Sequence, residues 1–175
     1  LNPEVLSATP ELLARQMRHL AEHYHPLSCQ ELIEALAAGK EIPPGSVLVT
    51  FDDGYKDFAT VAWPILKEYG IPAILFVATA YPGDEQRLFW WDKLHQGLVR
   101  TTRRELTVPG LGTLSLNGQS WLEPTFLQLK DYLQGMEHHR AMTTLDGILE
   151  KLEVVPQREG TLLSWEEIKE LAEDG

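Results

Sequence analysis

The segment "VLVTFDDGYKD", residues Val47 to Asp57, constrains the fold more than any other stretch of this chain. Its first five residues, Val47–Phe51, are apolar or β-branched, and such an unbroken run predicts a strand buried on both faces, as in a parallel sheet. Asp52 and Asp53 follow directly, and Gly54 lets the backbone turn sharply behind them. Two adjacent carboxylates at the end of a buried strand repel each other and lose hydration. We therefore expect another group to offset the repulsion and the lost hydration of the two carboxylates.

A second apolar run, "AILFVAT" (Ala73–Thr79), predicts another buried strand. Between the two runs, the apolar spacing from Ala59 to Leu66 predicts a helix that ends at Gly70, with Pro64 bending it or lying in its first turns. Strand, helix and strand within about thirty residues form a βαβ unit, whose strands are parallel with a right-handed crossover. Active sites of parallel α/β folds lie at the carboxyl ends of strands, where the two aspartates are expected.

Upstream, Thr9-Pro10 predicts the start of an amphipathic helix, and Ser28-Cys29-Gln30-Glu31 is a capping box that opens a second helix with Leu32, Ile33 and Leu36 on one face. Downstream, from about residue 84 to 160, the pattern predicts helices around a small β-hairpin, "LTVPGLGTLSL", which we interpret as an insertion. A second capping box, Ser164 to Glu167, then opens a short helix toward Gly175.

The composition, with 43% hydrophobic and 23% charged residues, is typical of a soluble globular protein. The formal net charge of −11 argues against binding to a nucleic-acid backbone. No apolar run approaches the roughly 20 residues of a membrane helix. Cys29 is the single cysteine, so no disulfide forms within the chain. Neither a cytoplasmic nor a cell-envelope location is favoured, no signal peptide is evident, and the oligomeric state is undecided.

The adjacent aspartates allow two interpretations. A divalent cation would offset their repulsion by holding one carboxylate, and the other could then act as a base on water, as in metal-assisted hydrolysis. Alternatively, Asp-Asp-Gly after a strand is a turn with a helix N-cap and has no chemical role.

The surrounding residues favour the first interpretation. "TFDDGY" (Thr50–Tyr55) followed by "WPILKEYGIPAILFVAT" (Trp63–Thr79) resembles the first motif and second strand of the polysaccharide deacetylase family, the NodB-homology domain of carbohydrate esterase type. The paired helices upstream, "FWWDKL" (residues 89–94), and "LSWEEIKELAEDG" (residues 163–175) are also similar to segments of that family. The resemblance covers nearly the whole chain, as the N-terminal half of such a domain.

The resemblance implies a distorted (β/α) barrel, of which residues 1–175 would form a part that carries the mainly helical insertion. It implies a hydrolase that removes acetyl groups from N-acetylated sugars of a polysaccharide or glycan. Asp52 matches the catalytic base of the motif and Asp53 matches a metal ligand. The metal is usually zinc, and it polarises the amide carbonyl and stabilises the oxyanion.

The resemblance also has a gap. The family completes its metal site with an H-x-x-x-H motif and carries an arginine and a general-acid histidine later, and none of these has a match here. His19 and His23 have the right spacing, but they are predicted on a solvated helix face. We therefore expect this chain alone to be inactive and to hold no metal tightly, since zinc sites normally have three or four protein ligands.

Two other functions remain open. A non-catalytic fragment or relative that binds glycans or a partner would also lack the histidines. A haloacid-dehalogenase-like phosphohydrolase also places aspartates after a buried strand, but it requires Asp-x-Asp, and the aspartates here are adjacent. The sugar polymer and the metal cannot be identified from the sequence.

Overall fold

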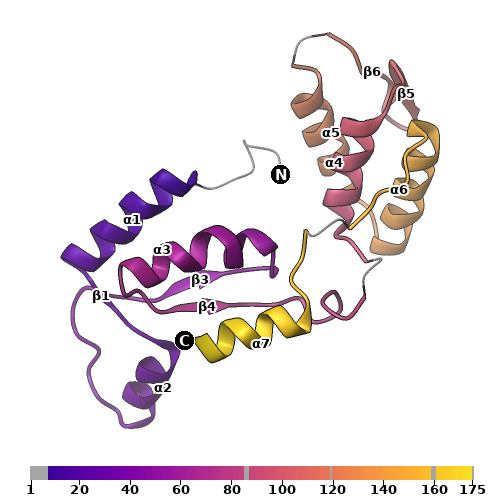
Figure 1. The fold of residues 1–175 in the computed structure, drawn as a ribbon. Helices are drawn as coiled ribbons and strands as arrows, with labels where there is room; N and C mark the ends of the chain where they lie inside the picture. The colour runs from indigo at the N-terminus through magenta and orange to yellow at the C-terminus, as the bar shows by residue number, and fades with distance from the viewer. Residues whose placement is uncertain (1–7, 85–86, 119, 159–160, 175) are drawn as a thin grey trace. The chain divides into compact units, whose positions relative to one another are not determined.

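The computed structural model describes residues 8–84, 87–118, 120–158 and 161–174 (Figure 1). The chain divides into two compact units: unit 1 comprises residues 1–85 and 160–175, and unit 2 comprises residues 86–159. The fold is mixed α/β and mostly helical, with short parallel strand pairs and one antiparallel hairpin. The strands of the described residues form three separate two-stranded sheets, so no closed barrel is present among them.

Unit 1 begins with two capped helices, as the sequence predicts. In α1 (Pro10–His23) the Thr9 hydroxyl accepts a hydrogen bond from the Leu12 N–H, and in α2 (Cys29–Ala37) Ser28 and Glu31 form the capping box. The two-residue strands β1 (His25–Pro26) and β2 (Ser46–Val47) pair in parallel on either side of α2 in the chain.

The predicted βαβ unit follows. Strand β3 (Val49–Phe51) pairs in parallel with β4 (Ala73–Leu75), in the register Phe51 opposite Leu75. Both strands are shorter than the apolar runs that predicted them. Between them lie the π-helix η1 (Phe58–Ala62) and the helix α3 (Trp63–Glu68).

Pro64 explains the π-helix. It has no N–H to donate back along the helix, and the preceding Trp63 N–H bonds to the Phe58 carbonyl, five residues earlier. Of the two alternatives for Pro64, its position in the first turn of the helix is confirmed, and the widened turn η1 precedes it.

Unit 1 has its own apolar core. Buried side chains from α1, η1, α3 and the chain just before β4 form it: Met17, Phe58, Ala62, Leu66 and Ile71. Leu171 of α7 (Trp165–Asp174) packs against this cluster. Asp174 of α7 also accepts hydrogen bonds from Trp63 and Lys67, so the C-terminal helix α7 contacts α3.

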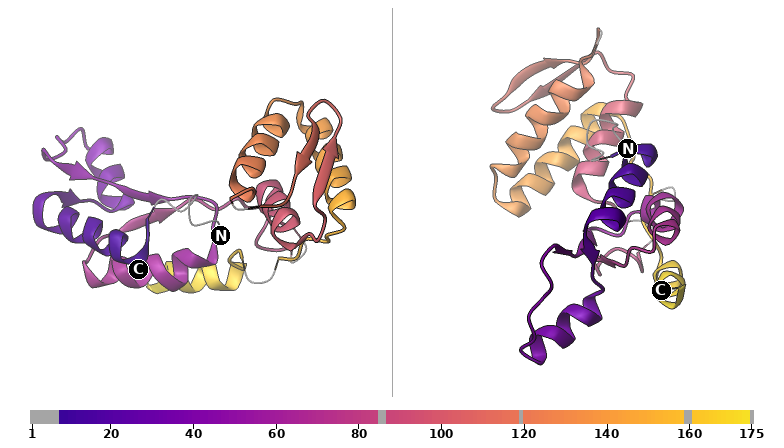
Figure 2. Two further views of the ribbon diagram at one scale, coloured as in Figure 1. Left: turned by 90° about the horizontal axis from the view of Figure 1, so that it is seen from above. Right: turned by 90° about the vertical axis from the view of Figure 1, so that its left-hand side faces the viewer.

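Unit 2 has a separate core between three helices and the hairpin (Figure 2). The helices are α4 (Trp90–Arg100), α5 (Leu122–Gln134) and α6 (His138–Leu152), and the hairpin strands are β5 (Glu105–Val108) and β6 (Gly112–Ser115). The helical character and the hairpin are as predicted, whereas the interpretation of residues 84–160 as an insertion stays a prediction. No helix in the described part of the chain has the length and apolarity needed to cross a bilayer.

Two helical glycines in unit 2 make a matched pair for a stability test. A Cβ on Gly97 of α4 would lie 2.7 Å from Leu149 Cδ2 and 3.1 Å from Leu152 Cδ1, whereas a Cβ on Gly147 of α6 would meet nothing within 4 Å. Ala favours a helix over Gly by about 1 kcal/mol, and overpacking a core costs about 1–3 kcal/mol. We expect Gly147→Ala to raise the free energy of unfolding and Gly97→Ala to lower it, as urea denaturation would show. Equal effects of the two substitutions would contradict the close α4–α6 packing.

Candidate active site

The two aspartates lie directly after β3, at its carboxyl end. Phe51, the last residue of β3, pairs with Leu75, and its carbonyl accepts a hydrogen bond of 2.8 Å from the Phe76 N–H. The predicted position, at the end of a strand parallel to the Ala73 strand, is confirmed. Asp52 is exposed and Asp53 is half-buried, so the two carboxylates experience different surroundings.

Asp53 has an unusual backbone conformation. Its φ is +72°, and the Gly54 N–H donates a hydrogen bond of 2.9 Å to the Asp52 carbonyl across it. An i to i+2 hydrogen bond around a residue of positive φ indicates a γ-turn of the rare, strained kind. Gly54 also has a positive φ, +77°, which glycine adopts freely. Strain at a non-glycine residue persists where the surrounding structure holds it, and it is concentrated at functional sites.

The electrostatics of the turn single out Asp53. Burial raises the pKa of the Asp53 carboxyl above its ordinary value, and the negative charge of neighbouring Asp52 raises it further. No described cation pairs with Asp53 to offset either effect. The two unfavourable effects expected from the sequence, repulsion between the adjacent aspartates and loss of hydration, therefore both act on Asp53 in the folded chain.

A distant segment holds the turn in place. Residues 161–163 run antiparallel to it: Tyr55 bridges Leu162, the Lys56 N–H donates to the Thr161 carbonyl at 2.9 Å, and the Leu163 N–H donates to the Gly54 carbonyl at 2.9 Å. Backbone pairing over more than a hundred residues of sequence separation thus fixes the chain immediately after Asp53.

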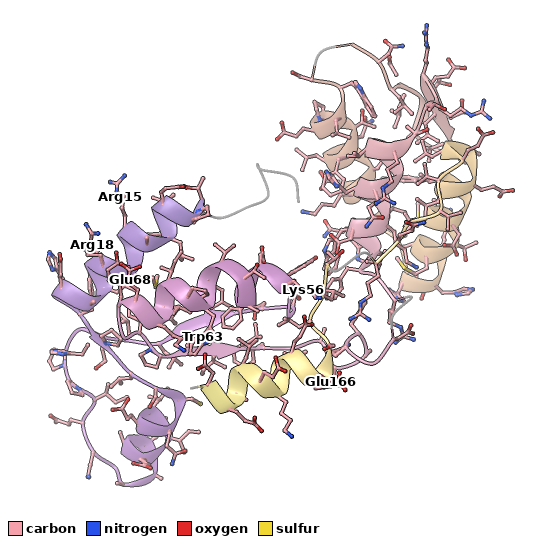
Figure 3. The ribbon with its side chains drawn as sticks, in the orientation of Figure 1. Arg15, Arg18, Lys56, Trp63, Glu68 and Glu166 are labelled. Carbon is pink, nitrogen blue, oxygen red and sulfur yellow. The ribbon has the colours of Figure 1, made fainter. Side chains whose placement is uncertain are left out.

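One carboxylate links this segment to the turn. Glu167 of α7 accepts a hydrogen bond of 2.8 Å from the Ser164 N–H through Oε2, and its Oε1 lies 3.0 Å from Lys56 Nζ. Figure 3 labels Lys56 and, at the start of α7, Glu166. The capping box that the sequence predicts therefore also forms an ion pair with the residue three positions after Asp53. Sequence reasoning missed this role, because capping accounts fully for the Ser-x-x-Glu pattern.

The donor set at this strand end consists of two carboxylates. Carboxylate oxygen suits a divalent cation, but a zinc site normally has three or four protein ligands. Among the described residues, no group of three or more His, Cys, Asp or Glu side chains is placed to hold a metal. Within the described residues, the two aspartates alone do not make up the ligand set of a zinc site.

The histidines lie elsewhere. His19 and His23 contact each other on α1, with ring centroids 4.5 Å apart, and both are exposed. The predicted solvated face is confirmed. His138 and His139 are exposed at the start of α6, and His95 packs edge-on against Phe126 in the core of unit 2, where burial lowers its pKa.

The raised pKa of Asp53 predicts a pH-dependent stability difference. The folded chain binds the proton of this carboxyl more tightly than the unfolded chain does, so ionised Asp53 destabilises the fold as the pH rises above about 4 and through the raised pKa. Asn tolerates a positive φ and carries no charge. We expect Asp53→Asn to be more stable than the parent at pH 7 and equal to it at pH 3, as denaturant titrations would show. Asp146→Asn, at an exposed position of α6, is the control and should change little at either pH. A difference of the same size at both pH values would contradict the assigned cause.

Comparison with known families gives one match in this region. The sequence model described as "Polysaccharide deacetylase" matches residues 39–107, which include β3, both aspartates and β4. The resemblance inferred from "TFDDGY" is confirmed over these residues.

Individual proteins that are similar to this chain are also named as deacetylases. The poly-β-1,6-N-acetyl-D-glucosamine N-deacetylase of Escherichia coli (strain K12) is 29% identical over 120 residues, which cover 66% of this chain and 18% of that protein. The candidate polysaccharide deacetylase YxkH of Bacillus subtilis (strain 168) is 37% identical over 65 residues, which cover 37% of this chain and 23% of that protein. The chain thus spans about a fifth of the length of these curated relatives.

Among solved structures, a Streptococcus pyogenes deacetylase, PplD, in complex with acetate is 33% identical, with a TM-score of 0.40, over 47% of this chain and 39% of that chain. The deacetylase domain of BpsB from Bordetella bronchiseptica is 16% identical, with a TM-score of 0.43, over 100% of this chain and 43% of that chain. The family's sequence model matches the strand-and-aspartate region: residues 39–107 are similar to the polysaccharide deacetylase family.

Proposed function

We propose that this chain is part of a metal-dependent carbohydrate N-deacetylase, a hydrolase that removes acetyl groups from N-acetylated sugars of a polysaccharide or glycan. The observation that carries the proposal is the strained Asp52-Asp53 turn at the end of β3, inside the region that matches the family. The names of the relatives in Escherichia coli and Bacillus subtilis also support a polysaccharide substrate.

Asp52 is the proposed catalytic base. Its side chain is exposed at the strand end, where substrate and water have access. It takes a proton from a water molecule as the water oxygen attacks the carbonyl carbon of the acetamido group. The C–N bond then breaks, the sugar nitrogen leaves with a proton as an amine, and the acyl group is released as acetate.

Asp53 is the proposed metal ligand of this chain. A divalent cation such as zinc would supply Lewis-acid polarisation of the amide carbonyl. Burial and the charge of Asp52 disfavour the ionised form of the Asp53 carboxyl, and a cation at this position would stabilise that form. The other metal ligands that the proposal requires are not found among the described residues at this strand end.

The proposal for the fold is less detailed than the proposal for the two aspartates. The parallel β3–β4 pair with an intervening helix is compatible with part of a distorted (β/α) barrel, with residues 84–160 as an insertion of the NodB-like domain. A non-catalytic glycan-binding module is the second candidate, and the incomplete ligand set in the described residues favours it.

The test is release of acetate by the full-length protein. The protein is incubated with zinc and with β-1,6-linked or β-1,4-linked N-acetylglucosamine oligomers, and acetate is measured by a coupled enzyme assay. We expect acetate release that a chelator abolishes and zinc restores. Binding of the oligomers without acetate release would favour the glycan-binding module and contradict the deacetylase.

A further inference from the structure

Unit 2 contains a groove of its own, which the deacetylase proposal does not use. It lies between the β5–β6 turn, the C-terminal part of α5 and one face of α6, and its volume is about 420 Å³. This is within the range of roughly 300–1,000 Å³ that is typical of small-molecule sites. We refer to it as the α6 groove. Its lining comes entirely from unit 2, in the described part of the chain.

The α6 groove carries positive charge in a strongly acidic chain. Arg140 and Lys151 line it, and no Asp or Glu of the described residues does, although the formal net charge of the whole chain is −11. The Lys151 ammonium donates to the Thr107 carbonyl at 2.8 Å, which fixes its place at one end. The Arg140 guanidinium has no hydrogen bond or ion pair within the described residues, and the nearby Glu137 carboxylate caps the N–H groups of His139 and Arg140.

Arg140 and Lys151 lie on the same face of α6. Eleven positions separate them, so their Cα atoms are about 16 Å apart along the helix axis. Gly147 lies between them on that face, and a Cβ there would meet nothing within 4 Å. The middle of the groove is thus left open by the absence of a side chain.

The middle of the groove offers acceptors and apolar surface. The Tyr132 hydroxyl donates its proton to the Pro109 carbonyl, so its oxygen is available to accept a hydrogen bond. The hydroxyls of Thr143 and Thr144 donate to backbone carbonyls of α6 and present their oxygens in the same way. Met136 and Pro109 supply apolar surface. A sugar ring has an apolar face and hydroxyl donors that would match this lining.

The geometry points to the α6 groove as a binding site for a short anionic saccharide, with acidic groups toward Arg140 and Lys151 and ring hydroxyls over Tyr132 and the threonines. Cations at both ends select negative charge, and charge-assisted hydrogen bonds are the stronger contacts. The site is independent of the Asp52-Asp53 turn, so either proposal can fail without the other.

The test uses trigalacturonate as the probe and its fully methyl-esterified form as the neutral control, titrated into the full-length protein by calorimetry at 50 mM and 300 mM salt. We expect binding of trigalacturonate, at least about tenfold weaker binding of the ester, and weakening at high salt. Titration with sulfated and phosphorylated trisaccharides separates a carboxylate site from a site for other anionic sugars. Equal binding of acid and ester, or no binding of any of these anions at low salt, would overturn the proposal.

Three variants assign the binding to this groove. Arg140→Gln should weaken trigalacturonate binding at least about tenfold, whereas Arg104→Gln, the same charge change at an exposed position outside the groove, should not. Gly147→Leu should fill the middle and abolish binding without lowering the thermal midpoint, because Leu favours a helix over Gly. Unchanged binding in both Arg140→Gln and Gly147→Leu would refute the site.

Discussion

Replacement of Asp52 by Asn should reduce acetate release by the full-length protein at least about 100-fold, because a positioned general base contributes roughly 10² to 10⁴ to the rate. The amide keeps the shape of the carboxylate but cannot take a proton from water. Asp52 is exposed at the end of β3, so the change should not disturb the fold. The measurement is acetate release, with the metal content determined on the same preparation.

Asp57→Asn is the matched control for this variant. It removes one negative charge five residues further along the chain, at the residue before η1. We expect it to retain acetate release within a few-fold of the parent. An Asp52→Asn variant as active as the control would contradict the role of Asp52 as base.

Replacement of Asp53 by Ala should lower both the metal content and acetate release, and excess zinc should restore part of the activity. The loss follows from removing one of the few ligands that a zinc site has. Asp53→Asn is the control for backbone strain, since Asn tolerates a φ of +72° better than Ala does. If Asp53→Asn is at least as stable as the parent and also loses metal, the loss of metal comes from the missing carboxylate and not from a disturbed turn. A zinc content unchanged in both variants would contradict the ligand assignment.

The sequence predicts those features that depend on local residues. Caps at Thr9, Ser28 and Ser164 depend on side chains within a few positions, and all three form. The apolar run before Asp52 and Asp53 predicts the parallel strand β3, but not its burial, since Val49 and Phe51 are only partly buried and Thr50 is exposed.

The features that the sequence could not predict depend on distant residues. The pairing of residues 161–163 with the turn after Asp53 joins segments a hundred residues apart, and no local pattern specifies it. The positive φ of Asp53 was not predicted either, because the sequence reasoning assigned the turn to Gly54 alone. The sequence predicts a helix between the two strands, with Pro64 bending it or lying in its first turns. Pro64 does lie in the first turn of α3, but the π-helix η1 that precedes it was not predicted.

Amphipathic spacing also misleads where no partner covers the apolar face. Leu32, Ile33 and Leu36 lie on one face of α2, a pattern that usually faces a core. Ile33 and Leu36 are 54% and 64% exposed, and α2 has no buried residue. Periodicity predicts that a helix forms but does not state what it packs against.

The most direct test of the central claim is a paired measurement on Asp52→Asn and Asp53→Ala of the full-length protein: zinc per chain by atomic emission, and acetate released from N-acetylglucosamine oligomers. If Asp52 is the base and Asp53 the ligand, Asp52→Asn retains zinc and loses activity, whereas Asp53→Ala loses zinc and activity together. The reverse pattern of zinc retention would show that the two roles are exchanged, and full acetate release by both variants would contradict the deacetylase account.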